Sequence, residues 1–282
     1  SPSASMSTLR PASKVFAGNC CIHFIAHDYY GNRLATCSSD KKIRVFDKGE
    51  DDQWQLSSEW SAHKSTIWQV DWAHPEFGQV LASCSDDRTV VIWSEKGEGT
   101  AGQQEVKFKF QPMATLSDFG KGVTCVRFAP SHLGLQLASA SNDGKVRLHH
   151  GSATNLNVWS LGSELEPDGP GFGANVTCVS WDKSRLDAPM LVVGWSRAGE
   201  PRVSSVAIWG LSAEKKQWVV ALRLEVEADK KGAVPEVRDV DWAPPMGRPH
   251  HLIAAALGSS VQVWRVGALA GWEERRGGAA ER

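Results

Sequence analysis

The sequence has no long hydrophobic run, no excess charge of one sign and only two tyrosines. Its longest apolar stretch, Leu252 to Leu257, is far shorter than the roughly 20 residues that span a bilayer, so no membrane helix is expected. A net charge of −1 gives no long-range field that would attract nucleic acid or a membrane surface. Because residues 1–19 contain no hydrophobic signal core, we expect no secretion and free cysteines in a reducing compartment.

Metal-binding and catalytic motifs are also missing. Among the six cysteines only Cys20 and Cys21 lie close together, and adjacent residues have the wrong spacing for zinc. His149-His150 and His250-His251 have no acidic or thiol partners at ligand spacing, which favours ordinary strand or loop positions. We therefore predict no metal site, no cofactor and no catalytic residue.

What the sequence does contain is an internal repeat. The segments RLATCSSDKKIRVFD (33–47), VLASCSDDRTVVIW (80–93) and LQLASASNDGKVRLHH (135–150) align with one another. In this alignment the turn aspartates at positions 40, 87 and 143 coincide, as do Phe46, Trp93 and His149 six residues later. Two weaker copies end at Trp209 and Trp264. These end points are somewhat further apart than the roughly 40 to 45 residues of a WD-repeat propeller blade, which leaves room for a loop insertion in each unit.

Each unit is predicted to form four short strands. In the second unit these are Thr66–Ala73, Gln79–Ser85, Val90–Trp93 and Phe108–Leu116, with an Asp-rich turn at 85–88. No segment shows sustained helical periodicity. The predicted fold is all-β, a WD-repeat β-propeller in one domain. The expected boundaries are a disordered N-terminal tail at 1–19, the propeller at 20–266 and a low-order C-terminal tail at 267–282.

Four polar residues of the second unit form the most specific constellation, namely His63, Ser83, Asp87 and Trp93. One interpretation is a hydrolase triad of Ser, His and Asp. We favour a structural network instead, because neither a GxSxG elbow nor a Gly-rich loop accompanies Ser83 to supply an oxyanion hole. Such a network would satisfy polar groups that the blade buries.

The segments that connect the blades show a more specific family resemblance than the repeat alone. The segments WAHPEFGQVLASCSDDRT, RFAPSHLGLQLASASNDG and DVDWAPPMGRPHHLIA, together with HDYYGNRLATCSSDKKIRVFDK, resemble the Seh-type WD-repeat nucleoporins, the Sec-thirteen homologues. The similarity runs from about Cys21 to Val266. In that family, the resemblance implies, a His before the first strand meets a turn Asp, a strand Ser and a strand Trp inside one blade, as the four residues above would.

The resemblance implies a non-enzymatic scaffold role. Members of this family belong to the Y-shaped coat complex of the nuclear pore and support nucleocytoplasmic transport of protein and mRNA. They also serve in a complex at the vacuolar or lysosomal membrane surface that controls nutrient signalling to the TOR kinase. Their propeller is an open ring, and a helical nucleoporin partner contributes an extra blade that pairs with the exposed sheet edges and completes it. No direct contact with nucleic acid and no membrane insertion are expected.

The chain departs from the family pattern at its end. After Val266 no strand alternation follows, so the fifth unit lacks its outer strand and a sixth unit is absent. Truncation or splicing explains this, and we favour it; closure by five blades alone is the other explanation. The N-terminal segment contains only a weak strand candidate, Lys14–Ala17, as an open ring requires.

We assign the partner contact to Ile22, Phe24 and Ala26, which are spaced two apart in the strand CIHFIAH. The other interpretation is an ordinary inner strand of the first blade.

Three other functions fit a propeller. A ubiquitin-ligase substrate receptor would need an appended docking segment, and the sequence shows none. A propeller hydrolase is disfavoured by the absent nucleophile and metal sites. A COPII-like vesicle-coat subunit is the nearest alternative, because it shares the fold and the partner-closed ring, and WAHPEFGQVLASCS fits either relative.

Overall fold

Strands dominate the computed structural model, which describes residues 20–98, 107–167, 169, 175–185, 188–197, 203–227, 234–258 and 260–267. The helical segments among these residues are two single 3-10 turns, Pro75–Phe77 and Ser131–Leu133. The prediction of an all-β fold is therefore confirmed. No helix in the described ranges is long and apolar enough to cross a membrane. The two predicted tails lie outside these ranges, apart from Gly267.

The strands form five antiparallel sheets, which we number blades 1 to 5 in chain order. In each of the first four blades, consecutive strands pair side by side, as the repeat predicted. The strands of blades 1 and 2 are β1 (Ile22–His27), β2 (Arg33–Ser38), β3 (Lys42–Lys48), β4 (Trp54–Ser61), β5 (Ile67–Trp72), β6 (Val80–Ser85), β7 (Val90–Glu98) and β8 (Lys107–Leu116). Those of blades 3 and 4 are β9 (Val123–Phe128), β10 (Gln136–Ser141), β11 (Val146–Ser152), β12 (Asn155–Leu165), β13 (Asn175–Trp181), β14 (Met190–Arg197), β15 (Val203–Leu211) and β16 (Trp218–Leu224).

Blade 5 has three strands within the described residues. They are β17 (Val237–Trp242), β18 (His251–Leu257) and β19 (Ser260–Val266), paired in that order. The segment after Val266, where an outer strand of this unit would lie, is outside the described residues apart from Gly267, so the predicted incompleteness of the last unit stays a prediction. The edge of β19 that faces away from β18 is the place where the other blades carry their fourth strand.

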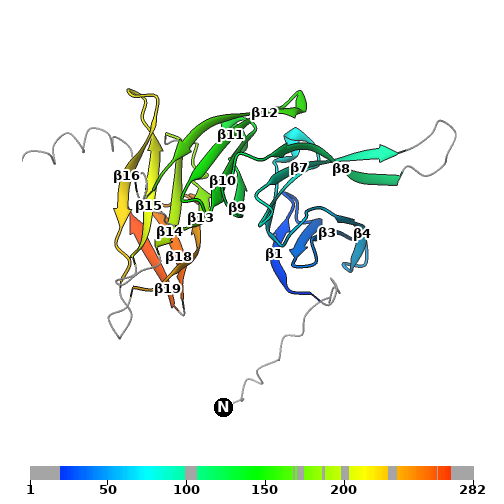
Figure 1. Cartoon of the computed structure of the whole chain (residues 1–282), viewed down its shortest axis with the longest axis horizontal. Helices are drawn as coiled ribbons and strands as arrows, with labels where there is room; N and C mark the ends of the chain where they lie inside the picture. The colour runs from blue at the N-terminus through cyan, green and yellow to red at the C-terminus, as the bar shows by residue number, and fades with distance from the viewer. Residues whose placement is uncertain are drawn as a thin grey trace, which may run out of the picture.

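The blades stand side by side around an open ring. The first strand of each blade packs against the first strand of the next, from β1 through β5, β9 and β13 to β17. Figure 1 shows that this arc does not close, and that blade 1 and blade 5 stand on either side of the opening. The open ring that the resemblance implied is therefore observed.

Apolar layers between neighbouring blades form the core. Between blades 1 and 2, Cys37 and Val45 pack in one cluster with Val70 and Leu81. Every residue of β6 is buried, because this strand has a neighbouring sheet on each of its faces. That position accounts for its small apolar composition in place of an alternating pattern. Full burial of one large aliphatic side chain contributes about 1.5–3 kcal/mol.

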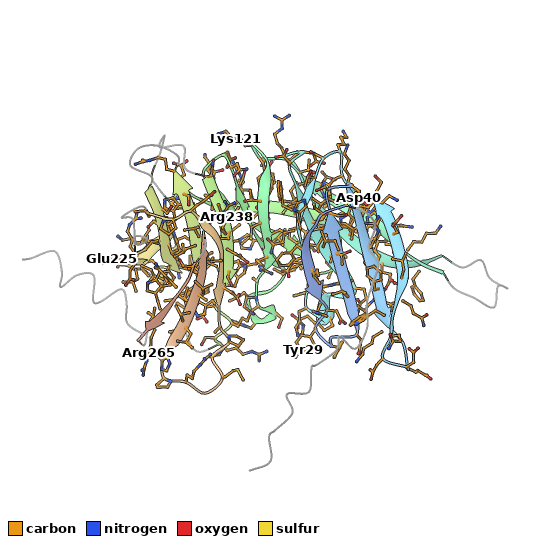
Figure 2. All side chains as sticks on the ribbon, turned by 90° about the horizontal axis from the view of Figure 1, so that it is seen from below. Tyr29, Asp40, Lys121, Glu225, Arg238 and Arg265 are labelled. Carbon is orange, nitrogen blue, oxygen red and sulfur yellow. The ribbon has the colours of Figure 1, made fainter. Side chains whose placement is uncertain are left out.

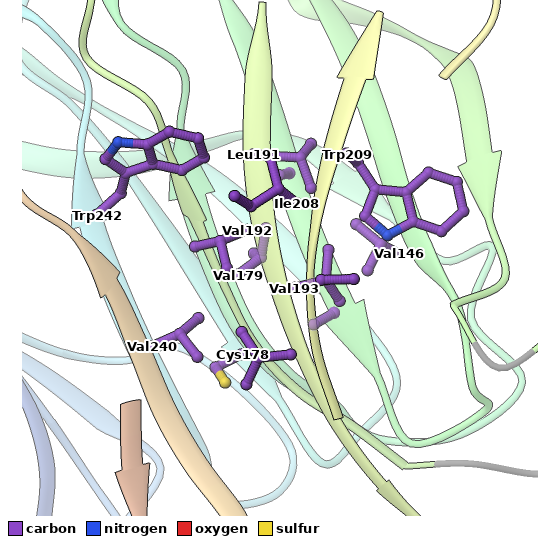
Figure 3. Packing of buried hydrophobic residues seen from close by; sticks show 14 of the residues in the cluster. Val146, Cys178, Val179, Leu191, Val192, Val193, Ile208, Trp209, Val240 and Trp242 are labelled. Carbon is purple, nitrogen blue, oxygen red and sulfur yellow. The ribbon is translucent and has the colours of Figure 1, made fainter. Parts of the chain in front are cut away.

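Blade 5 packs closely onto blade 4. Val240 and Trp242 of β17 belong to the same cluster as Cys178 of β13 (Figure 3). Gly194 of β14 lies at this contact, where a Cβ atom would meet Cγ1 of Val237 at 2.6 Å and Sγ of Cys178 at 2.7 Å. A side chain at position 194 would therefore separate the two sheets.

The turn between the second and third strands is the same in blades 1 to 3. In blade 2, Oδ1 of Asp87 accepts the N–H of Thr89 at 3.1 Å, and the N–H of Arg88 donates to the carbonyl of Ser85 at 3.2 Å. Arg88 has a φ of 68°, in the left-handed region that favours glycine. Blades 1 and 3 place Lys41 (φ 68°) and Gly144 (φ 93°) at this position.

Candidate functional site

The four predicted polar residues of blade 2 meet in one hydrogen-bonded network. Nδ1 of His63 lies 3.0 Å from Oδ2 of Asp87, and its Nε2 lies 2.7 Å from Oγ of Ser83. The indole N–H of Trp93 donates to the same Oγ at 2.9 Å. The network joins the segment before β5 to β6, the β6–β7 turn and β7, so it ties together most of one blade.

The chemistry of the partners determines where the protons lie. An ionised carboxylate only accepts, so Nδ1–H of His63 donates to Asp87 and Nε2 accepts the hydroxyl proton of Ser83. Burial would raise the pKa of Asp87, but hydrogen bonds from His63 and Thr89 and from the N–H of Lys64 hold it below its usual range. The carboxylate is therefore fully satisfied while ionised.

This order of contacts resembles a Ser-His-Asp triad, but Ser83 has no access to a substrate. Ser83 is 0% exposed, and its oxygen already accepts the Trp93 indole N–H. A nucleophile needs an open position beside an oxyanion hole. The arrangement therefore satisfies buried polar groups of one blade and leaves no room for acyl transfer.

In blades 1 and 3 the turn aspartate is paired with an arginine instead of a histidine. Arg44 lies 2.7 Å from Asp40, and Arg147 lies 2.8 Å from Asp143. Both arginines also pair with a glutamate of the fourth strand, through Arg44–Glu59 at 2.6 Å in blade 1 and through the equivalent pair in blade 3. Val91 occupies this position in blade 2. The recurring Asp-x-x-x-Arg spacing in DKKIR and DGKVR was the available signal, which the sequence analysis missed.

The three residues assigned to partner binding do not lie on one face of β1. A β-bulge between Ile22 and Phe24 pairs Ile22 with Ser38 and Phe24 with Cys37. Paired residues share a face of the sheet, so the bulge turns Ile22 to the side opposite Phe24. Ala26 is 7% exposed and packs toward blade 2, where its carbonyl accepts the indole N–H of Trp72. The spacing of two residues between Ile22, Phe24 and Ala26 therefore does not place their three side chains on one surface.

Ile22 instead shares the outer face of blade 1 with Ile25. Ile25 pairs with Thr36, two residues before Ser38, and therefore lies on the side turned away from blade 2. Ile22 is 42% exposed and Ile25 is 51% exposed. We call this side the outer face of blade 1; Leu56 of β4 is a further exposed apolar residue on it, because it pairs with Phe46.

Blade 5 presents an equivalent outer face. Ile253 and Leu257 of β18 pack toward blade 4, which leaves Ala254 and Ala256 on the other side. Val263 and Val261 pair with these two alanines and are 62% and 68% exposed. Exposed apolar sheet faces therefore stand on both sides of the ring opening, and together they are the candidate docking site.

The cysteines do not form a reactive site. Cys37, Cys84, Cys125 and Cys178 are buried in the strands, as predicted, and Cys20 and Cys21 are exposed without a disulfide. Burial raises the pKa of the Cys37 and Cys125 thiols to about 12, so both stay protonated at neutral pH. Among the described residues no group of three or more His, Cys, Asp or Glu side chains is placed to hold a metal ion.

Comparison with protein families identifies the repeats. The model of the WD domain, G-beta repeat, matches residues 11–47, 54–94 and 110–150. Each match ends one residue after Phe46, Trp93 or His149. The second and third matches begin in the fourth strand of the preceding blade, β4 or β8, and continue into the third strand of blade 2 or blade 3.

Comparison with curated proteins finds similarity across most of the chain. The protein called Nucleoporin SEH1 is 38% identical over 242 residues in Bos taurus, and 37% identical over 242 residues in Homo sapiens. Both alignments cover 83% of this chain and 63% of the relative. Nucleoporin SEH1 of Danio rerio is 37% identical over 248 residues, with 87% of this chain and 65% of the relative covered. The chain thus spans slightly less than two thirds of the length of these relatives.

Proposed function

This chain is a WD-repeat homologue of the nucleoporins named SEH1, and on this premise we propose that it is a non-enzymatic scaffold subunit of the nuclear pore. Its place is then the nuclear envelope, within the Y-shaped coat complex, where it supports transport of protein and mRNA. The nutrient-sensing complex upstream of TOR, at the vacuolar or lysosomal surface, is a second assembly in which the same scaffold role would operate.

The observation that carries this proposal is the open ring with an exposed apolar face on each side. Val261 and Val263 of blade 5, and Ile25 of blade 1, are more than half exposed on faces that in a closed propeller contact a further blade. A partner that inserts β-structure between blades 1 and 5 covers these side chains and pairs with free strand edges. The proposed partner is a helical scaffold nucleoporin that donates this β-structure, and other subunits of the coat bind around the pair.

Co-purification tests the proposal. The full chain is produced together with the N-terminal region of the cognate helical nucleoporin, and the complex is measured by size-exclusion chromatography with light scattering. We expect a one-to-one complex. Substitution of both valines, Val261→Glu with Val263→Glu, places charge in the docking site and should reduce affinity at least about tenfold, because each buried carboxylate would lose its water.

A matched control uses Val158→Glu. Val158 lies on β12 and is 54% exposed, so it resembles the two valines in size and exposure but is remote from the opening. This variant should bind as the unmodified chain does. Failure of the unmodified chain to bind, or equal loss of binding in both sets of variants, contradicts the proposed docking site.

A further inference from the structure

One face of the ring is built from equivalent loops. In every blade described residues of the loop from the first to the second strand contribute to it, at 28–32, 73–79, 129–135, 182–185 with 188–189, and 243–250. Figure 2 shows Tyr29, from the first of these loops, and Arg265, from the end of β19, on one side of the ring, with Lys121 and Asp40 on the opposite side. We call the side of Tyr29 the loop face.

The loop face contains a cavity at the centre of the ring, with a volume of about 370 Å³. All five blades line it, through residues that include Tyr29, Trp72, Arg127, Trp181 and Asp241. Two carboxylates, Asp71 and Asp241, are among the residues that line this cavity. Arg127 lies 3.8 Å from Asp71, and the hydroxyl of Ser180 donates to Asp241 at 3.0 Å.

A second cavity, of about 700 Å³, lies between the loops of blades 4 and 5. It is lined by Pro245, Met246, Arg248 and His250, and Met246 is 81% exposed. Lys183 and Arg185 line both cavities, so these two exposed side chains stand on the ridge that separates them.

The charged residues that line the second cavity are Lys183, Arg185 and Arg248, and Lys183 also interacts electrostatically with Asp71 of the first cavity. Neither Lys183 nor Arg185 forms an ion pair with a described carboxylate. Arg248 donates to the carbonyl of Pro244 at 2.6 Å, while its buried Nε and Nδ1 of His250 find no hydrogen-bond partner within the described ranges. Desolvation lowers the pKa of His250, and the positive charges of Arg265, Arg248 and His251 lower it further.

We propose that the loop face is a second interaction surface, separate from the ring opening, which binds an acidic linear segment of a partner protein across Lys183 and Arg185. The carboxylates of such a segment pair with these two side chains and with Arg248. Its apolar residues enter the two cavities beside Met246 and Trp181. Charge complementarity of this kind sets the specificity and the association rate of a contact.

Shape and net charge favour a peptide over other anionic partners. The chain has a net charge of −1, so it lacks the broad positive field with which proteins attract nucleic acid. A flat membrane surface would touch the ridge but would leave both cavities empty. An extended peptide fills them, because a few side chains match cavities of 370 and 700 Å³.

Fluorescence anisotropy with the full chain tests the inference. The probe is a labelled ten-residue peptide of alternating Glu and Leu, and the comparison peptide replaces every Glu by Gln. We expect the acidic peptide to bind at least about tenfold more tightly, with an affinity that falls as salt rises. In the double variant Lys183→Glu with Arg185→Glu, the affinity for the acidic peptide should be at least about tenfold lower than in the unmodified chain. Lys121→Glu, on the opposite side of the ring, is the matched control and should change nothing.

Several outcomes overturn the inference. They are equal binding of both peptides, unchanged affinity in the double variant, no binding at low salt, and tighter binding of a DNA duplex or of phosphatidylserine vesicles than of the acidic peptide. Circular dichroism verifies folding. If the charge reversal prevents folding, the milder pair Lys183→Gln and Arg185→Gln replaces it, with the same direction expected. Because these measurements omit the nucleoporin partner, their failure leaves the proposed docking at the ring opening untouched.

Discussion

Nε2 of His63 lies 2.7 Å from Oγ of Ser83, and the two residues join the segment before β5 to the middle of the same blade. The exposed fractions of the two residues are 8% and 0%. In that environment a polar atom without a partner costs about 1–3 kcal/mol. The pair therefore links a local turn motif to the stability of the whole blade.

Removal of the imidazole should destabilise the protein. His63→Ala leaves the Ser83 hydroxyl and the Asp87 carboxylate without their shared partner, and we expect a loss of about 1–3 kcal/mol in the free energy of unfolding. Urea denaturation measures it. His132→Ala is the control, because His132 is exposed and its removal should change stability little. Equal stability of the two variants would show that the network contributes nothing.

Acid should weaken blade 2 through Asp87. Its pKa in the folded protein lies below the value of about 3.9 that an unfolded aspartate has. The ionised carboxylate therefore stabilises the fold above about pH 4, and this contribution is lost as the pH falls through the folded-state pKa. Asp87→Asn should be less stable than the unmodified chain at pH 7, and the difference should shrink between pH 5 and pH 2. Parallel stability curves over this range would contradict the assignment.

The arginine that replaces the network in blade 1 should be coupled to its aspartate. A double-mutant cycle with Arg44→Met and Asp40→Asn should give a coupling free energy of about 1 kcal/mol, because the two side chains are only 8% and 18% exposed. The Lys48 and Asp52 pair is the control. It has the same sequence spacing, but its side chains are 36% and 78% exposed, so its coupling should be much smaller. Equal coupling in the two pairs would refute the role of burial.

A methyl group at Gly194 should loosen blade 5. Gly194→Ala places a Cβ within 2.6 Å of Val237 and 2.7 Å of Cys178, and the overpacked contact should cost about 1–3 kcal/mol. Gly267→Ala is the control, since nothing lies within 4 Å of the added atom. Differential scanning calorimetry compares the melting temperatures. We also expect faster amide hydrogen exchange in β17 and β18 of Gly194→Ala, and exchange unchanged from that of the unmodified chain would argue against this role of the glycine.

Most of the fold was predictable, because the sequence patterns that indicate its strands and turns involve residues close together in the chain. The four strands of the second repeat were expected at Thr66–Ala73, Gln79–Ser85, Val90–Trp93 and Phe108–Leu116, and β5 to β8 lie there with small shifts and a longer β7. Strand periodicity and turn chemistry involve residues a few positions apart, so the sequence displays them directly. The repeat alignment located Asp87 and Trp93, and the resemblance to WD-repeat proteins implied that both meet His63 and Ser83 in one network.

The open faces were less predictable. A single bulge in β1 reverses the side on which Ile22 lies relative to Phe24, and no composition signal marks it. The arginine pairs of blades 1 and 3 needed a comparison between repeats at a position where blade 2 has Val91. In β1 the pairing with the neighbouring strand decides which residues share a face.

The sequence by itself determined the repeat, the strand order within each blade and the Asp-centred turns, since each of these depends on hydrogen bonds and alternation over short distances. Only the tertiary structure decided which face of blades 1 and 5 remains uncovered, and that Lys183 and Arg185 share a cavity with Arg248. The physical reason is that burial and electrostatic environment depend on contacts between sheets, and these are set by the packing of residues far apart in the chain.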